Sequence, residues 1–241
     1  MPYATHTIAR RRRVLGTVLA AGAIVAMAPA AADARIIELG QTSTQPVPSC
    51  PTKPCLAVSR TTGYQVKVGT TTDMFVAPRR GRIVAWSVIL GDPTKKQIKF
   101  FNTTLGGEPS AGISVFRPGE RLRGTITGQS PVMPLKDYLG ETVQFPLKTS
   151  LTVLKGYRVA LTVPTWAPAR AVGFGEDTSW RASRTRKQCD DTNTQTAVTT
   201  LGTMTRFLCL YQTARLTYTV TMITEPHGPP KKKKKKPGAK P

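Results

Sequence analysis

The sequence predicts an all-β protein, an antiparallel β-sandwich or barrel followed by a disordered tail. Several segments alternate apolar and polar residues with period two, as half-buried strands do. Turn-forming residues separate these segments, and the 241 residues include 20 Gly and 20 Pro. Beyond the first 34 residues, no apolar stripe of helical period extends over more than two turns. Many short strands with Gly/Pro turns favour a sandwich or barrel.

Residues 1–34 have the three parts of a cleavable export signal. Arginines occupy positions 10–13, an uncharged run follows at residues 14–28, and small residues end in an A-x-A site at 32–34. The run of 15 residues is shorter than the roughly 20 that a spanning helix needs. We therefore expect a secreted chain, extracellular or wall-associated, without a transmembrane span once mature. The arginines leave general secretion and twin-arginine export both open.

The rest of the chain divides into a Pro/Cys-containing lead-in at residues 35–62, a sandwich domain at 63–224 and a basic tail at 225–241. The predicted strands lie near residues 64–68, 83–90, 97–100, 143–147, 157–163 and 216–222. Pro146 interrupts one of them, which indicates a sheet edge.

The three tryptophans receive different predictions. Trp86 lies mid-strand between valines and is expected in the core. Trp166 follows a strand end and is expected at the rim. Trp180 lies in a polar stretch and is the least core-like of the three.

The four cysteines predict two disulfides in an exported chain. Proximity favours Cys50–Cys55 and Cys189–Cys209, although the sequence leaves three connectivities open. A four-cysteine zinc site is the rival, but the second pair lacks the short spacing typical of zinc ligands. We expect no metal and no other cofactor.

Positive charge dominates the chain. It has 35 Lys and Arg against 13 Asp and Glu, a formal net charge of +22. The tail contains seven lysines, five prolines and two glycines, a composition that predicts disorder. An electrostatic tether to a polyanion and a merely solubilising segment fit this composition equally well. The loop at 175–200 carries a second basic run. Its candidate anion-binding residues are Trp180, Arg181, Arg184, Arg186 and Lys187, and the alternative is a solvated loop without a ligand.

Histidine is almost absent. His6 lies in the predicted signal and His227 in the tail, so the predicted domain has neither a Ser-His-Asp nor a Cys-His catalytic set, nor His-ligated zinc. Glycan hydrolysis needs only two carboxylates. The conceivable pairs are Asp177 with Asp190 or Asp191, and Glu141 with Asp137.

Two segments resemble a known group. Residues 75–88, FVAPRRGRIVAWSV, are similar to an "APxxGxIxxWxV" hairpin of uncharacterised secreted β-sandwich proteins from high-GC actinobacteria. Residues 145–161 resemble the second strand pair of that group. The resemblance covers residues 63–222 and implies a single jelly-roll-like sandwich and export. It supplies no catalytic or ligand-binding residues.

The sequence therefore predicts an exported, non-catalytic binding or structural module. The basic loop and lysine tail would hold it to an anionic polymer, a wall phosphate polymer or polysaccharide ahead of nucleic acid. The alternative is an extracellular glycan hydrolase that uses a carboxylate pair. Its oligomeric state is left open.

Overall fold

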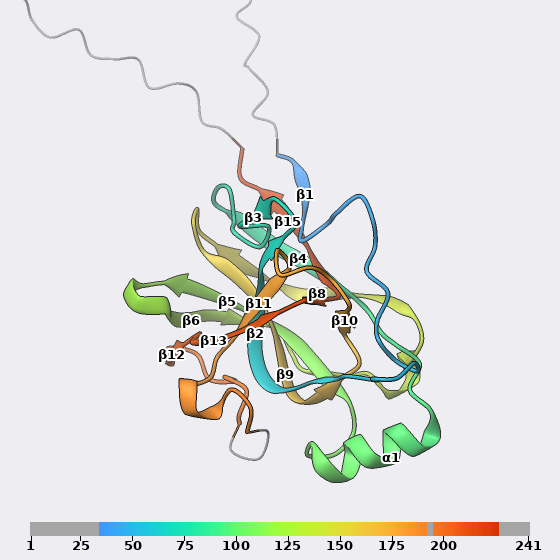
Figure 1. The fold of residues 1–241 in the computed structure, drawn as a ribbon. Helices are drawn as coiled ribbons and strands as arrows, with labels where there is room; N and C mark the ends of the chain where they lie inside the picture. Colours follow the sequence, from blue (N-terminus) through green and yellow to red (C-terminus); the bar gives the residue numbers. More distant parts are fainter. Residues whose placement is uncertain (1–33, 192–194, 227–241) are drawn as a thin grey trace, which may run out of the picture. The chain divides into compact units, whose positions relative to one another are not determined.

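The computed structural model describes residues 34–191 and 195–226, which form one compact unit (Figure 1). The predicted export signal, apart from Ala34, lies outside the described residues. The predicted basic tail also lies outside them, apart from Glu225 and Pro226. No helix within the described ranges is long and apolar enough to span a bilayer.

Four strands form the first sheet, and all their pairings are antiparallel. Their order is β1 (Ile36–Leu39), β15 (Tyr218–Thr224), β4 (Gly81–Ile89) and β8 (Thr142–Val153).

The second sheet has nine strands, again antiparallel. The main path runs β12 (Met204–Arg206), β6 (Arg123–Gln129), β5 (Ser110–Pro118), β9 (Arg158–Ala167), β2 (Val58–Val68), β11 (Ser179–Ala182) and β13 (Cys209–Gln212). Two short strands branch from it: β3 (Thr71–Thr72) pairs with β2, and β7 (Met133–Pro134) pairs with β5.

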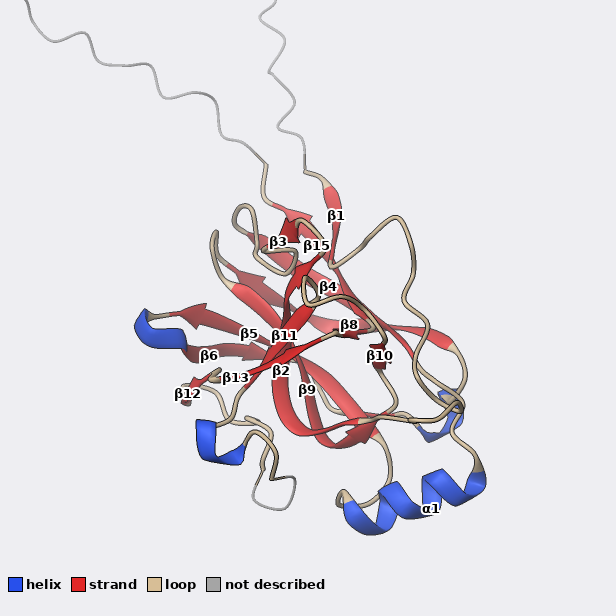
Figure 2. Cartoon of the chain, viewed as in Figure 1, coloured by secondary structure: helices blue, strands red, loops and turns tan. Residues whose placement is uncertain are grey.

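A separate two-stranded ribbon pairs β10 (Arg170–Val172) with β14 (Ala214–Leu216). Strands dominate the described chain, as Figure 2 shows, so the all-β prediction is confirmed. The helical elements are α1 (Lys95–Thr104) and the 3₁₀ turns η1 (Glu120–Leu122), η2 (Lys136–Tyr138) and η3 (Arg186–Gln188).

The main core contains the inward side chains of both sheets. Trp86, Phe145 and Val220 of the first sheet belong to the same buried cluster as Val115 and Leu161 of the second. Because side chains alternate along a strand, the residues between these point away from the core. A smaller cluster, with Tyr64, Phe116 and Phe207 among its members, is buried separately.

Most predicted strands form. The segments at 64–68, 83–90, 143–147 and 157–163 fall largely within β2, β4, β8 and β9. The segment at 216–222 is shared between β14 and β15. Pro146 lies on β8, which occupies an edge of the first sheet as predicted. The lead-in at 35–62 differs from its prediction, because β1 and the beginning of β2 make it part of both sheets.

The strand predicted at 97–100 is wrong, because these residues belong to α1. Thr94 caps this helix in a capping box: its Oγ1 accepts from the Gln97 amide, and its own amide donates to Gln97 Oε1. Ile98 and Phe101 face inward at helical spacing and contribute to a third apolar cluster with Trp166.

Trp166 is fully buried, so its predicted place at the rim is wrong. The ring of Phe101 lies 4.8 Å from it, and its Nε1 donates to Asn102 Oδ1 and the Gly107 carbonyl. Burial is possible because α1 covers this ring and the loop after the helix satisfies its polar atom. Trp86 is also fully buried, as predicted.

Both favoured disulfides form. Cys50 bonds to Cys55, Cys189 bonds to Cys209, and no cysteine is left for a metal. The disulfide prediction is confirmed. Such bonds persist mainly in oxidising compartments, so they indicate an oxidising environment for the folded chain.

Candidate functional site

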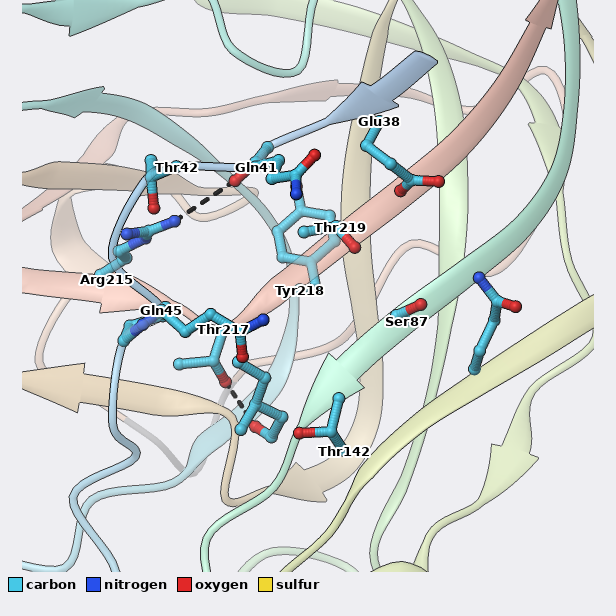
Figure 3. A pocket seen from close by; sticks show the side chains of 14 residues that line it. Glu38, Gln41, Thr42, Gln45, Ser87, Thr142, Arg215, Thr217, Tyr218 and Thr219 are labelled. Atoms are coloured by element: carbon cyan, nitrogen blue, oxygen red, sulfur yellow. Dashed lines mark hydrogen bonds between the residues drawn. The ribbon is translucent and has the colours of Figure 1, made fainter. Parts of the chain in front are cut away.

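A pocket lined mainly by residues with polar side chains opens on the outer face of the first sheet (Figure 3). We call residues 40–47, which lie next to it, the strap, and we call the pocket itself the polar pocket. Its volume is about 220 Å³. The sheet strands and the strap supply most of the wall, and β14 adds one arginine. The lining consists of Glu38, Gly40, Gln41, Thr42, Gln45, Pro46, Ser87, Ile89, Thr142, Gln144, Arg215, Thr217, Tyr218 and Thr219.

Strand register builds the floor of this pocket. Thr219 on β15 is paired with Ser87 on β4, and Ser87 is paired with Gln144 on β8. Their chain neighbours Trp86 and Val220 are buried in the core, so the polar row faces outward. Three adjacent strands thus present hydroxyl and amide groups side by side.

Arg215 is the cation of the pocket and is only 5% exposed. Its Nη2 donates to the Gly40 carbonyl at 3.3 Å, and its Nη1 donates to the Thr44 carbonyl at 3.5 Å. It forms no ion pair with any carboxylate in the described ranges. Burial lowers the pKa of this guanidinium, yet an arginine stays charged in a protein. Arg215 is therefore a buried positive charge whose partners are neutral carbonyls.

A second cavity, of about 600 Å³, shares Arg215 with the polar pocket. It also contacts strap residues from Gln41 to Val47, and its remaining wall comes from Val68, Thr71, Val172 and Phe174. Arg215 and the strap thus border both cavities.

The lining defines what the pocket can do. Ser, Thr and Gln side chains both donate and accept hydrogen bonds, and Arg215 adds one fixed positive charge. Glu38 is the single carboxylate in this lining, and Figure 3 shows it well apart from Arg215. Across the described part of the chain, no three His, Cys, Asp or Glu residues gather as metal ligands. The arrangement suits binding of a hydroxyl-rich ligand with a negative group.

Trp180 of the predicted basic site is 2% exposed and belongs to the main core, so its predicted role in an anion-binding site is wrong. It lies on β11, between β2 and β13, and its ring stacks on Tyr211 with centroids 4.5 Å apart. A strand paired on both sides carries its ring into the core, where no ligand can stack on it.

The four basic residues of the predicted site separate as well. Arg184 is 8% exposed; its Nη2 donates to the Ser59 carbonyl at 2.6 Å and its Nη1 to the Tyr211 hydroxyl. Arg181 is half-buried and donates to the Phe207 carbonyl. Arg186 and Lys187 are exposed on η3. The five residues do not converge on one ligand site, and anion binding by Arg186 and Lys187 stays a prediction.

The candidate carboxylates lie elsewhere. Asp137 belongs to η2, Glu141 precedes β8, Asp177 precedes β11, and Asp190 and Asp191 follow η3. None of the five lines the polar pocket or the second cavity.

Sequence analysis missed Arg215. An isolated arginine between Ala214 and Leu216 gives little signal, because the polar residues Thr213 and Thr217 flank the same segment. Ser87 and Thr219 occupy outward positions of two predicted strands. The sequence did not predict that these two strands pair and place both residues side by side.

Comparisons with protein-family models, curated proteins and solved structures found no match to this chain.

Proposed function

We propose that this chain is an exported, non-catalytic module that binds anionic polymers at the cell surface or in the extracellular space. The observation that carries the proposal is an excess of positive charge on the folded part. Between residues 35 and 226 there are 24 Lys and Arg but 12 Asp and Glu. Even if every carboxylate were paired, half of these cations would still be available to an anion from outside the chain.

Several further features support this proposal. Described ion pairs such as Arg80–Glu225 and Lys136–Glu108 are solvent-exposed, so they neutralise surface charge only locally. The two disulfides fit an extracellular compartment. The basic residues Arg186 and Lys187, and the lysines of the tail, would add to retention on a polyanion. The partner that we propose is a wall phosphate polymer or a polysaccharide.

The strand order also supports the jelly-roll architecture that we propose for the sandwich. β1 pairs with β15, β2 with β9, β4 with β8 and β5 with β6, so early strands pair with late ones in nested order. Rolling up such a nested antiparallel ribbon makes two sheets with Greek-key connections, here β1-β15-β4-β8 and the four neighbouring strands β2-β9-β5-β6 of the nine-stranded sheet. The resemblance to secreted actinobacterial sandwich proteins is compatible with this arrangement.

The hydrolase alternative has less support from the geometry. A glycosidase of the usual kind needs two carboxyl groups that flank the scissile bond, about 5–9 Å apart. The polar pocket contributes Glu38 alone. A second acid would have to come from a residue outside the lining.

A salt series on immobilised polymers tests the proposal. The mature chain is applied to resins of a phosphate polymer, an acidic polysaccharide, DNA and a neutral polysaccharide. We expect retention on the phosphate and acidic resins that falls steeply with salt, and little retention on the neutral resin. Equal retention on neutral and acidic resins, or retention insensitive to salt, would contradict the proposal.

Two variants test in the same assay whether the loop or the tail holds the chain on the polymer. We expect Arg186→Gln with Lys187→Gln, and separately a deletion of residues 229–241, each to lower the salt at which the chain elutes. The matched control is Thr149→Ala, a substitution at an exposed position of β8 that leaves the charge and η3 unchanged. If both charge variants elute with the wild type, the loop and the tail are not the tether.

A further inference from the structure

We propose that the polar pocket binds one acidic sugar unit of the polymer, with its carboxylate on Arg215. This inference rests on the proposed function and names the ligand class of the polar pocket. Its starting point is a buried cation beside a cavity. A buried charge is costly unless a counter-charge and hydrogen bonds compensate it. Arg215 has no carboxylate partner among residues 34–191 and 195–226, and it borders both cavities.

The guanidinium retains capacity for a ligand. Arginine has five N–H donors in a planar fork, and Arg215 uses two of them, on the carbonyls of Gly40 and Thr44. Both bonds are long, at 3.3 and 3.5 Å. A carboxylate accepts two parallel N–H bonds from such a fork, and the ionic bond is shorter and stronger than one to a carbonyl.

The charge count favours a monoanionic group. Arg215 is the single cation of the lining, and Glu38 contributes a negative charge at another part of the wall. A carboxylate carries one negative charge, whereas a phosphate monoester carries about 1.5 to 2 at neutral pH. One arginine therefore matches a carboxylate better than a phosphate monoester.

The rest of the lining favours a sugar as the carrier of that carboxylate. Sugar hydroxyls donate and accept, as do the side chains of Ser87, Thr219 and Gln144 on the pocket floor. Glu38 can accept from a further hydroxyl. An apolar acid would leave these polar groups unpaired, which is unfavourable in a partly enclosed site.

The volume sets the size of the bound unit. About 220 Å³ is below the 300–1,000 Å³ typical of sites for drug-sized molecules, so the pocket holds a single ring. The second cavity, on which Arg215 also borders, offers space for a neighbouring unit of the chain.

The test is calorimetric titration of the full chain with a tetramer of galacturonic acid, a tetramer of glucose and a sulfated glucose tetramer. We expect the uronate to bind at least about tenfold tighter than the glucose tetramer, which offers no anion to the fork. We also expect it to bind tighter than the sulfated tetramer, because a sulfate ester is a weaker hydrogen-bond acceptor than a carboxylate. Equal affinity for the glucose or the sulfated tetramer would overturn the assignment.

Substitutions of lining residues test whether the uronate binds in the polar pocket. Ser87→Ala with Thr219→Val should weaken uronate binding about tenfold, through the loss of two neutral hydrogen bonds. Arg215→Gln should weaken it by about thirtyfold or more, and Arg215→Lys should restore part of the loss, since lysine keeps the charge without the fork. Thr152→Val is the matched control, an exposed threonine on β8 outside the lining. It should leave the affinity unchanged.

The outcomes separate this inference from the proposed function. If the Arg215 variants fail to fold in thermal melts, the Ser87/Thr219 double variant still decides, because both of its positions are on the solvent-facing side of the sheet. Uronate affinity that is unchanged in the double variant would refute the pocket, while retention on acidic resin would leave the proposed function standing. Failure of the proposed function is a different result: no salt-dependent retention of the wild type on any anionic resin.

Discussion

Arg184 and Arg215 are buried to nearly the same extent but have different surroundings. They are 8% and 5% exposed, and neither pairs with a carboxylate in the described residues. Burial lowers the pKa of both guanidinium groups, and the Tyr211 hydroxyl partly opposes this for Arg184. Arg184 makes short bonds to Ser59 and Tyr211, whereas Arg215 makes long bonds to the strap and borders two cavities.

The difference shows what a buried arginine needs in order to bind a ligand. Arg184 also lies over the Tyr211 ring, with its guanidinium carbon 5.6 Å from the centroid. Its strong partners are all within the fold, and neither the polar pocket nor the second cavity reaches it. Burial and charge are shared by both residues, so adjacent space and weak internal partners distinguish Arg215.

Replacing each arginine with methionine should have the largest effect and should test this comparison directly. Arg184→Met removes two charge-assisted hydrogen bonds, each worth about 1.5–3 kcal/mol, so we expect a loss of about 3 kcal/mol or more in the free energy of unfolding. Both variants relieve a buried charge, but Arg215→Met loses only the two long bonds, so we expect a loss of about 1 kcal/mol or less. Urea unfolding at neutral pH measures both.

The exposed neighbour Arg186 provides the control, since Arg186→Met should leave stability close to that of the wild type. Equal losses for Arg184→Met and Arg215→Met would break the comparison, because they would show that Arg215 is also mainly a structural residue.

The sequence predicted the strands better than the site, for a physical reason. Alternation is a local pattern, and it located the segments of β2, β4, β8 and β9. It failed at residues 97–100, where four alternating residues fit a strand and a helix equally well. The Thr94–Gln97 capping box was the local signal that could have decided for the helix.

The pocket depends on contacts that no local pattern encodes. Arg215 bonds to Gly40, which lies 175 positions away in the chain. The basic run at 181–187 predicted an anion site because its charges are adjacent in sequence. In the fold, Trp180 on β11 is buried, while Arg186 remains on the surface. Charge density in a sequence therefore indicated basic surface, but it did not locate the cavity.

The two disulfides should contribute differently to stability, because they close loops of different length. Opening the Cys189–Cys209 loop, with a separation of 20, should cost about 3 kcal/mol from chain entropy, and opening Cys50–Cys55, with a separation of 5, about 2 kcal/mol. Urea unfolding of the two Cys→Ser double variants measures the difference. A larger loss at Cys50–Cys55 would contradict the loop-length argument.

The Cys189–Cys209 disulfide sharpens the comparison through its coupling to Arg184. Arg184 donates to the Tyr211 hydroxyl, which donates to the Cys189 carbonyl. A double-mutant cycle of Arg184→Met with the Cys189/Cys209 variant should therefore be non-additive by at least about 0.5 kcal/mol. The same cycle with Arg215→Met should be additive, because the hydrogen bonds of Arg215 go to Gly40 and Thr44, outside that loop.

Tyr218 lines the polar pocket, but its hydroxyl is hydrogen-bonded within the core. The hydroxyl donates to the Val159 carbonyl at 3.0 Å, and burial raises the pKa of this phenol well above 10. Above pH 10 the unfolded chain loses this proton first, so the folded state loses stability by about 1.4 kcal/mol per pH unit until the folded pKa is reached.

Tyr218→Phe should remove that dependence. At pH 7 the variant should be less stable by about 1 kcal/mol through the lost hydrogen bond. Between pH 10 and 11 the wild type should lose this advantage, because its unfolded state alone gains a phenolate. Urea unfolding of both proteins at pH 7, 9, 10 and 11 isolates the contribution, since the other titrating groups are common to both. A constant difference over this range would contradict the prediction, because it would mean that this phenol titrates alike in the folded and the unfolded chain.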